Sequence, residues 1–240
     1  MPKLSIVIPA FNEEGSIGTL LQSVRAVDLK SIGFEKEIIV VDDGSTDRTY
    51  KVATQFADVR VLKQVPNLGK GRAVQRGITE STGDLVLVQD ADLEYDPTDY
   101  PALLAASEGG TVAVYGSRIL GQLRERGWTV FPGKHSSQGL GPWIANVALS
   151  VWVFLLYGRW LTDSLTAYKL YPVRALRRYH VKTSGFETDH ELTAKLIRDG
   201  VPIREVPISY IPRSAAQGKK IRAIDGVIAL WTLFKFRFIA

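Results

Sequence analysis

The chain alternates between short apolar runs and stretches with helical spacing. Its first half holds five apolar runs bounded by turn-forming residues, and each has the length of a buried strand. They cover residues 4–9, 37–41, 59–62, 85–89 and 111–115. The segments between them carry helix caps and helical periodicity, as at Ser16 and over residues 48–56 and 67–78. This alternation predicts an α/β fold with a Rossmann-like, doubly wound and mostly parallel sheet.

The second half of the chain is less regular. A glycine-rich basic stretch is followed by a nearly apolar segment, a strand-like segment, a helix, an alternating edge-strand pattern and a basic helical end. These features cover residues 120–137, 143–157, 163–171, 185–200, 203–212 and 213–240. We therefore predict a main domain over 1–218 with an apolar helical insert at 139–160. A basic amphipathic helix over 219–240 completes the chain.

Composition narrows the class of protein. The 240 residues are 45% hydrophobic and 23% charged, which is ordinary for a globular domain with a substantial core. There are no cysteines, so disulfides and thiolate metal sites are excluded. The net charge of +5 favours an anionic partner, such as a phosphorylated substrate, an acidic membrane surface or nucleic acid. The first residues enter a strand directly, so we expect no signal peptide.

Acidic residues gather where the predicted strands end. Asp90, Asp92 and Glu94 follow the strand at 85–89 at intervals of two, which places them on one side of an extended backbone. Three such oxygen donors suit a hard divalent cation that also takes phosphate oxygens. A solvated acidic turn is the alternative for this motif alone. Glu13 and Asp42 follow two other strands, however, and the ends of parallel strands share one edge of the sheet.

A nucleoside diphosphate would explain this arrangement. Asp42 would accept hydrogen bonds from the base or ribose, and Phe11 would pack on the base. Lys70 and Arg72 at a helix start would supply donors for an anion, although a solvated helix residue is an equal alternative for Lys70. The loop at 69–74 lacks the third glycine of a dinucleotide fingerprint. No phosphate-binding loop of the P-loop ATPases occurs in the sequence.

Taken together, the motifs resemble those of family 2 glycosyltransferases, in the branch of the dolichyl- or polyprenyl-phosphate mannose and glucose synthases. They read IPAFNE at 8–13, VDDGSTD at 41–47, DADL at 90–93 and GSR at 116–118. Asp163 with Lys169, GFE at 185–187 and Arg213 with GKKI at 218–221 also match that branch. The resemblance implies a GT-A fold, a nucleoside-diphosphate sugar such as GDP-mannose or UDP-glucose, and a Mg²⁺ or Mn²⁺ ion.

The resemblance also implies roles for individual residues. It assigns the nucleoside to Pro9, Phe11, Glu13, Val40 and Asp42, and the metal and diphosphate to Asp90, Ala91, Asp92 and Glu94. By the same resemblance, Arg118, Arg213 and Lys219 would contact phosphates. Lys70 at its helix start and Lys134 in the basic stretch are further candidates for phosphate contacts, and Arg118 and Lys134 would meet the acceptor phosphate. Asp90, Asp92 and Arg118 would carry the catalysis.

Three positions depart from the family pattern. Phe11 replaces the usual tyrosine, Glu94 stands where glutamine is common, and Ala167 replaces a glycine. The extra negative charge makes Glu94 a weaker candidate for a metal ligand than Asp92.

The acceptor can be argued from chemistry. A lipid phosphate is already anionic near neutral pH, so it needs cations rather than a general base. The basic residues suit that task, and Asp189 is a possible base if the acceptor is a sugar instead. We therefore expect transfer of a hexose, with mannose favoured and glucose next, to a polyprenyl or dolichyl phosphate. The alternatives are a soluble glycosyltransferase with a saccharide acceptor and a non-catalytic nucleotide-sugar-binding protein.

A lipid acceptor requires a membrane. The apolar segment at 143–157 is shorter than the roughly 20 residues that span a bilayer. The C-terminal helix places Ile221, Ile224, Ile228, Trp231, Phe234 and Phe238 on one broad face. We therefore expect both helices to lie in the interface on the cytoplasmic side of a membrane, with core packing as the alternative. Nucleic acid is the least favoured partner, because the basic residues lie beside aliphatic helices.

Overall fold

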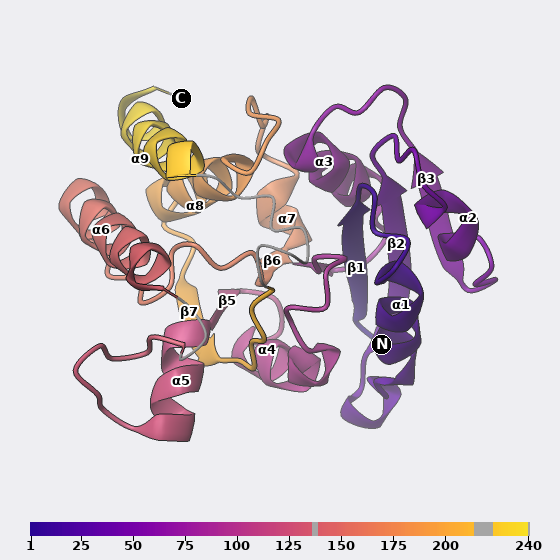
Figure 1. The fold of residues 1–240 in the computed structure, drawn as a ribbon, viewed down its shortest axis with the longest axis horizontal. Coiled ribbons are helices and arrows are strands. Elements are labelled where there is room, and N and C mark those ends of the chain that lie inside the picture. The colour runs from indigo at the N-terminus through magenta and orange to yellow at the C-terminus, as the bar shows by residue number, and fades with distance from the viewer. Residues whose placement is uncertain (136–138, 214–222, 240) are drawn as a thin grey trace.

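A mixed seven-stranded sheet runs through the molecule in the order β3-β2-β1-β4-β6-β5-β7 (Figure 1). The computed structural model describes residues 1–135, 139–213 and 223–239. Its strands are β1 (Lys3–Ala10), β2 (Glu35–Asp42), β3 (Val59–Lys63), β4 (Leu85–Val88), β5 (Ala113–Ser117), β6 (Lys169–Pro172) and β7 (Ile203–Pro207). All neighbouring pairs are parallel except those of β6, which runs antiparallel to β4 and β5. The predicted doubly wound, mostly parallel sheet is confirmed.

Helices cover both faces of this sheet. They are α1 (Ile17–Ala26), α2 (Thr49–Ala53), α3 (Lys70–Glu80), α4 (Tyr100–Ala106), α5 (Arg118–Arg126), α6 (Leu140–Tyr157), α7 (Val173–Leu176), α8 (Thr188–Arg198) and α9 (Ala223–Phe238), with 3₁₀ turns at Lys30–Ile32 and Pro97–Asp99. Alternate strand residues feed two separate cores, as the pleat of a strand requires. Leu85 and Leu87 pack with residues of α1 and α4, whereas Val86 and Val88 pack with residues of α3, α6, α8 and α9.

The central strands are apolar throughout because both of their faces are covered. All four residues of β4 are buried, as are seven of the eight in β1. Helix α3 lies especially close to β1, since a Cβ added at Gly77 would come within 2.2 Å of Val7 Cγ1. A larger side chain at residue 77 would therefore push α3 away from the sheet. This close packing places α3 against the sheet, and the start of the helix enters the site described below.

Two predicted strands are shorter in the structure than in the sequence pattern. Of the segment at 163–171, only Lys169–Pro172 forms strand β6, and the residues before it form a loop. The segment at 203–212 is strand only as far as Pro207, although the N–H of Ile208 still donates to the Ser117 carbonyl at 3.3 Å. β7 pairs with β5 alone, so the edge-strand prediction is confirmed.

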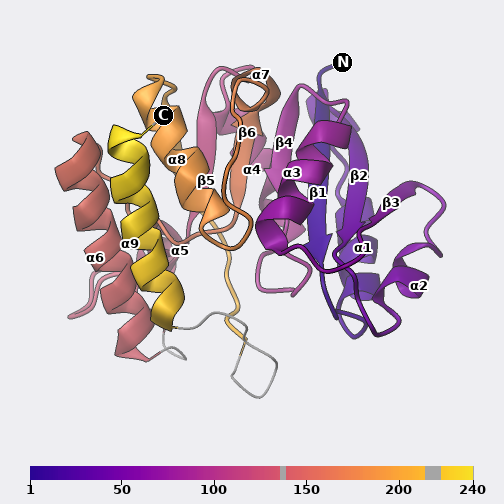
Figure 2. The same cartoon turned by 90° about the horizontal axis from the view of Figure 1, so that it is seen from above.

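Helices α6 and α9 lie side by side at the end of the sheet that is remote from β3 (Figures 1 and 2). The indole N–H of Trp152 donates to the Leu230 carbonyl at 3.0 Å, and the Tyr157 hydroxyl donates to that of Leu233 at 2.6 Å. Helix α6 has 18 residues, three more at its start than the apolar segment predicted, and it is the one helix in the described ranges long and apolar enough to cross a membrane. Only 22% of it is buried.

The C-terminal helix has two apolar faces. Leu233 and Phe236 are fully buried in the same core as Leu192 of α8. The side chains predicted to share a broad face are exposed instead, with Trp231 at 62% and Phe238 at 68%. Ile221 of that predicted face lies outside the described residues. Core packing and an exposed apolar face therefore coexist on α9, and the domain division at residue 218 stays a prediction.

Candidate active site

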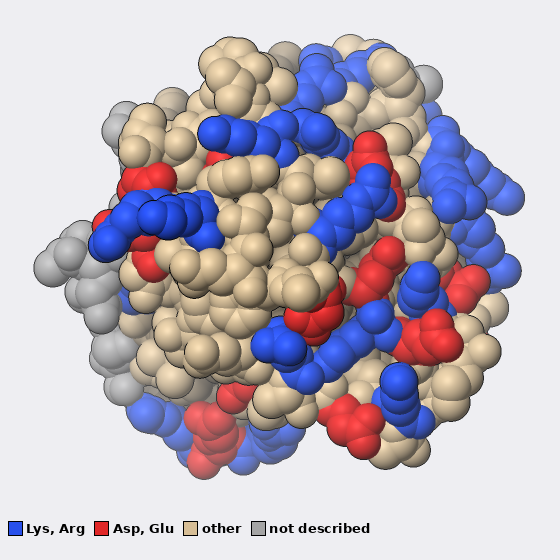
Figure 3. All heavy atoms as spheres, turned by 90° about the vertical axis from the view of Figure 1, so that its right-hand side faces the viewer, with Lys and Arg blue, Asp and Glu red and all other residues tan. Residues whose placement is uncertain are grey.

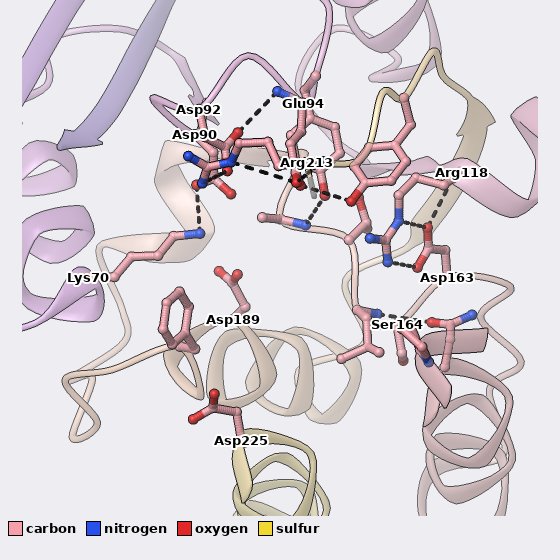
Figure 4. A pocket seen from close by; sticks show the side chains of 18 of the residues that line it. Lys70, Asp90, Asp92, Glu94, Arg118, Asp163, Ser164, Asp189, Arg213 and Asp225 are labelled. Carbon is pink, nitrogen blue, oxygen red and sulfur yellow. Dashed lines mark hydrogen bonds and ion pairs between the residues drawn. The ribbon is translucent and has the colours of Figure 1, made fainter. Parts of the chain in front are cut away.

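A cavity of about 780 Å³ lies at the carboxyl ends of β1 and β4. Helices α3, α5 and α8 all begin at it, with Lys70, Arg118 and Asp189 in their first turns (Figure 4). Helix starts present unpaired N–H groups and a partial positive charge. The edge of the sheet and the helix starts therefore form a cavity suited to anions.

Most of the predicted site residues meet in this cavity, as expected for residues that follow parallel strands. Those that line it are Pro9, Phe11, Glu13, Lys70, Asp90, Ala91, Asp92, Glu94, Arg118, Lys134 and Arg213. Val40 and Asp42 are not part of its wall, and Lys219 lies outside the described residues. The chain thus brings together segments that are up to 200 residues apart, as the contact between Glu13 and Arg213 shows.

The structure places Val40 and Asp42 differently from the expectation. Val40 is fully buried in the core, because β2 continues for two further residues before it reaches the edge of the sheet. Asp42 is also fully buried, and neither of its carboxylate oxygens has a hydrogen-bond partner among the described residues. An unpartnered buried carboxylate is costly, so Asp42 retains capacity to accept a hydrogen bond near the cavity.

Asp43 reaches the cavity where Asp42 was expected. Its carboxylate accepts hydrogen bonds from Gln64 Nε2 at 2.7 Å and from the backbone N–H groups of Leu68 and Gly69 at 2.9 and 2.8 Å. Asp43 therefore holds the loop that leads into α3 and so positions Lys70.

The acidic residues form an ion cluster with Arg213. One guanidinium nitrogen of Arg213 donates to Asp92 Oδ2 at 2.8 Å, and the other lies 3.4 Å from both carboxylate oxygens of Glu13. Beside this cluster, Lys70 Nζ pairs with Asp90 Oδ1 at 2.6 Å (Figure 4). Each predicted metal-side aspartate is thus neutralised by a basic residue of the chain itself.

The Glu94 carboxylate binds the segment that follows β7. Its Oε1 accepts from the backbone N–H of Arg213 at 2.8 Å, and its Oε2 accepts from the Tyr210 hydroxyl at 2.8 Å. Both oxygens therefore hold the segment after β7 against the loop after β4. Asp92 is the better placed metal ligand of the two. Its Oδ2 contacts the movable Arg213 side chain, and its Oδ1 accepts from the backbone N–H of Glu94 at 3.1 Å.

The charges in this cluster shift each other's protonation. Burial, together with the neighbouring Asp90 and Glu94 carboxylates, raises the pKa of Asp92 to about 7. For Lys70, burial lowers the pKa, but Asp90 and Asp189 outweigh it and leave the pKa above its ordinary value. A group of like charges in a partly desolvated site requires a cation, and oxygen donors suit Mg²⁺ or Mn²⁺.

The donor set fits such an ion in chemistry, because Asp90 and Asp92 supply carboxylate oxygens on one short loop. In the ranges that the structure describes, no three acidic or histidine side chains are arranged as a ready metal cage. The Arg213 guanidinium stands among the carboxylates in its place. Metal ligation here therefore requires Arg213 to change partners.

The opposite wall carries the Arg118 guanidinium. It forms two hydrogen bonds to the Asp163 carboxylate, and its centre lies 5.0 Å from the centre of the Tyr210 ring. Ser164, the residue after Asp163, also lines the cavity, and its buried Oγ has no hydrogen-bond partner in the described residues. Glu205 accepts from the backbone N–H groups of Thr162 and Asp163 and so fixes this loop. A held guanidinium and a hydroxyl with bonding capacity suit a second phosphate.

Asp189 faces the cavity from α8 (Figure 4). Burial raises the pKa of its carboxyl, and the neighbouring Lys169 and Lys70 ammonium groups oppose that shift. Lys169 is fully buried, and its Nζ has no hydrogen-bond partner within the described chain. Asp189 is thus a carboxyl with access to the cavity and a perturbed pKa, the combination that a general base requires.

Sequence reasoning missed several of these contributors. Asp43 lies within a quoted motif, but a one-residue shift changes the side of a strand to which a residue points. Ser164 and Tyr210 lie in segments that read as strand, and no sequence signal marked either side chain. Asp163 was quoted only as part of the resemblance, and its pairing with Arg118 joins residues 45 positions apart.

Comparison with known proteins identifies the family. The profile of "Glycosyl transferase family 2" matches residues 5–143, which is more than half of the chain. The chain belongs to this family. Its sequence is 33% identical over 132 residues to a dolichol-phosphate mannosyltransferase of Pyrococcus furiosus, covering 54% of this chain and 37% of that protein. It is 38% identical over 111 residues to a dodecaprenyl-phosphate galacturonate synthase of Rhizobium johnstonii, covering 44% and 32%.

Solved structures share the fold of this chain. Glucosyl-3-phosphoglycerate synthase from Mycobacterium tuberculosis, in complex with Mn²⁺, UDP and phosphoglyceric acid, superposes with a TM-score of 0.70 at 21% sequence identity. The match covers 100% of this chain and 80% of that one. The predicted GT-A fold is thereby confirmed. This family 2 chain spans 37% and 32% of the lengths of the two curated relatives.

Proposed function

We propose that the protein is a metal-dependent inverting glycosyltransferase. It moves a hexose, with mannose favoured and glucose next, from a nucleoside-diphosphate sugar to a polyprenyl or dolichyl phosphate. One observation carries this proposal: Asp90 and Asp92 on one wall and Arg118 on another face a single cavity (Figure 4). An acidic wall suits a cation-bound diphosphate, and a basic wall suits an acceptor phosphate.

The donor half of the site has separate parts for the two ends of a nucleotide. Pro9 and Phe11 in the cavity wall offer apolar surface for a base. Asp90 and Asp92 would hold the divalent ion, which stabilises the negative charge on the departing diphosphate when it is bound. The Mn²⁺ and UDP in the related synthase structure support this division.

The acceptor half needs no base for a phosphate nucleophile. Arg118 and Lys134 would hold the acceptor phosphate and reduce its repulsion from the diphosphate. A phosphate oxygen then forms a bond to the anomeric carbon from the face opposite the leaving group. The bond from that carbon to the diphosphate oxygen breaks, and the nucleoside diphosphate leaves with the electron pair.

An apolar surface beside the cavity supports a lipid acceptor. We call the exposed side chains of α6 and α9 the α6/α9 surface; it comprises Ile144, Val147, Val151, Phe154, Leu155, Ile224, Val227, Ile228, Trp231, Phe234 and Phe238. The end of the molecule with α1, α2 and β3 carries interspersed basic and acidic side chains instead (Figure 3). Exposed apolar patches of this extent favour a membrane or protein partner. We place the α6/α9 surface on the cytoplasmic face of a membrane.

The test is a transfer assay with radiolabelled GDP-mannose and UDP-glucose, Mn²⁺ and a short-chain polyprenyl phosphate in detergent. We expect a lipid-linked labelled product, and we expect Asp92→Asn to lose at least about 100-fold in rate. Donor binding without transfer or hydrolysis would favour the non-catalytic alternative and overturn the proposal.

A second candidate function rests on Asp189. A saccharide hydroxyl needs a base, and Asp189 lies in the cavity wall with a raised pKa. Transfer to a free sugar in solution, abolished by Asp189→Asn, would identify a soluble saccharide glycosyltransferase. Under the lipid-phosphate proposal the same substitution leaves the nucleophile intact and lowers the rate less than Asp92→Asn.

A further inference from the structure

Arg213 occupies a position that its neighbours would otherwise leave for another cation. Its side chain is 19% exposed, and those of Glu13 and Asp92 are 11% and 14% exposed. The guanidinium contacts both carboxylates, at 3.4 and 2.8 Å. Without it, these two carboxylates would share a poorly hydrated volume without a cation, which is unfavourable. The arginine is therefore a counter-ion built into the chain.

The backbone of Arg213 is held independently of its side chain. Its N–H donates to Glu94 Oε1 at 2.8 Å, and the N–H of Ile211 donates to the Glu94 carbonyl at 3.0 Å. The Tyr210 hydroxyl donates to the other carboxylate oxygen of Glu94. Since these contacts do not involve the guanidinium, the side chain can change partners while the segment stays in place.

The guanidinium is incompletely bonded where it lies. Its Nε is buried without a hydrogen-bond partner among the described residues, and the Oε1 of Glu94 lies 3.8 Å from it. The two contacts to Glu13 are long, at 3.4 Å each. An arginine that bound its partners optimally would use its fork of donors at 2.7–2.9 Å. These contacts favour release when better partners arrive.

Space for the released side chain exists on both sides of the cluster. A second cavity of about 510 Å³ adjoins the first. Glu13, Asp92 and Arg213 line both cavities, so this trio forms the wall between them. A change in the Arg213 rotamer would therefore connect the two cavities without moving a strand or helix.

We propose that Arg213 is an exchangeable internal cation that competes with the divalent metal for Asp92. This inference rests on the proposed function, because it requires a metal and a diphosphate as incoming ligands. A metal ion alone must displace the guanidinium and leave it without an anion. A metal ion with a nucleoside diphosphate supplies new partners for both cations. Metal and nucleotide binding are therefore coupled through Arg213, and each strengthens the other.

The test measures Mn²⁺ binding in the absence of transfer, by electron paramagnetic resonance of free Mn²⁺ with and without GDP or UDP. For the unaltered protein we expect weak binding of Mn²⁺ alone and at least tenfold tighter binding with a nucleoside diphosphate. For Arg213→Gln we expect Mn²⁺ alone to bind at least tenfold more tightly and the enhancement by nucleotide to shrink. Unchanged affinity for Mn²⁺ alone in Arg213→Gln would overturn the inference.

Two further variants keep the test decisive. Arg25→Gln removes a surface arginine paired with Asp58 and should leave both affinities unchanged. If Arg213→Gln does not fold, Arg213→Lys takes its place. A lysine keeps the positive charge but cannot reach Glu13 and Asp92 together, so we expect Mn²⁺ alone to bind this variant with intermediate affinity. A Mn²⁺ affinity equal to that of the unaltered protein would overturn the inference.

The proposed function fails separately from this inference. If neither GDP nor UDP binds the unaltered protein in Mn²⁺, then the nucleotide site itself is wrong. If the nucleotide binds and the Arg213 variants bind Mn²⁺ with the same affinity as the unaltered protein, then only the proposed exchange is wrong.

Discussion

The guanidinium of Arg118 and the carboxylate of Asp163 form a two-point ion pair, with Nε–Oδ2 and Nη2–Oδ1 distances of 2.7 Å each. The Asp163 side chain is 1% exposed and that of Arg118 is 20% exposed. Oδ2 also accepts from the backbone N–H of Arg118 at 3.0 Å. The carboxylate therefore fixes both the start of α5 and the direction of the guanidinium that faces the cavity.

Asp163→Asn should test whether the Asp163 carboxylate is needed to orient and neutralise the Arg118 guanidinium. The variant leaves a largely buried guanidinium without its anion, so we expect a loss of about 3–5 kcal/mol in the free energy of unfolding. We also expect a rate of transfer lower by roughly 10² with the KM for the acceptor raised more than that for the donor. Urea unfolding and steady-state kinetics provide the two measurements.

Asp58→Asn is the matched control for this variant. Asp58 forms an ion pair of 2.8 Å with Arg25, but the two side chains are 54% and 47% exposed. Exposed pairs contribute less than about 1 kcal/mol. Equal destabilisation by the two substitutions would show that burial of the Arg118–Asp163 pair has no energetic consequence.

Metal dependence should vary with pH because of Asp92. Burial and the neighbouring Asp90 and Glu94 raise the pKa of this carboxyl to about 7, and a metal ligand must be deprotonated. Protons therefore compete with the ion below about pH 7. With a single competing proton of pKa about 7, we expect the Mn²⁺ concentration for half-maximal nucleotide binding to rise roughly fivefold between pH 7 and pH 6. Removal of the metal with EDTA should abolish transfer, and a requirement for Mn²⁺ that is constant from pH 8 to pH 6 would contradict the assignment.

Much of this site was predictable because it depends on local patterns and one topological rule. The strand at 85–89 ends in Asp90 and Asp92, and the strand at 4–9 leads to Glu13. Parallel strands place such ends at one edge, so the convergence of these acids follows from the hydrophobic pattern alone. The position of Lys70 in the site was predictable for a similar reason, since the glycine before it marks a helix start at the same edge of the sheet.

Other features depend on packing that the sequence pattern does not contain. The antiparallel direction of β6 is set by its insertion between β4 and β5, and short apolar runs do not encode direction. The contact from Tyr210 to Glu94 joins residues 116 positions apart. Asp43 reaches the cavity in place of Asp42, because a difference of one residue decides which side chain faces the cavity.

Acid stability should depend on His190. Burial, with a smaller effect of Lys169, lowers the pKa of this imidazole to about 3, so the folded protein keeps it neutral. The unfolded chain binds the proton below about pH 6.5, and stability is therefore lost as the pH falls from about 6.5 towards 3. Each pKa unit between the unfolded and the folded state corresponds to about 1.4 kcal/mol in the free energy of unfolding.

His190→Asn removes this contribution, so we expect its free energy of unfolding to fall less steeply than that of the unaltered protein between pH 6.5 and 4.5. Urea unfolding at several pH values measures the slopes. His180→Asn, at an exposed histidine, should keep the original slope. Parallel profiles for all three proteins would show that His190 does not titrate differently in the folded and unfolded states.

Membrane binding should depend on the α6/α9 surface. Phe154 and Trp231 are 50% and 62% exposed and lie on α6 and α9, respectively. Burial of an aromatic or aliphatic side chain stabilises association by roughly 1.5–3 kcal/mol when it is complete. Replacing both with serine should therefore weaken binding to vesicles containing anionic phospholipid by at least about tenfold. Cosedimentation with such vesicles, compared with uncharged ones, measures the loss.

The matched control removes apolar surface elsewhere. Ile32 is 44% exposed in the 3₁₀ turn Lys30–Ile32, near the end of the sheet that carries interspersed charges. Ile32→Ser should bind vesicles as the unaltered protein does, because that end of the molecule faces water in the proposed orientation. If the unaltered protein is a dimer in solution and the double variant is a monomer that still binds vesicles, the α6/α9 surface is an interface between copies of the chain. The acceptor phosphate would then have to reach Arg118 from a bilayer that contacts some other face.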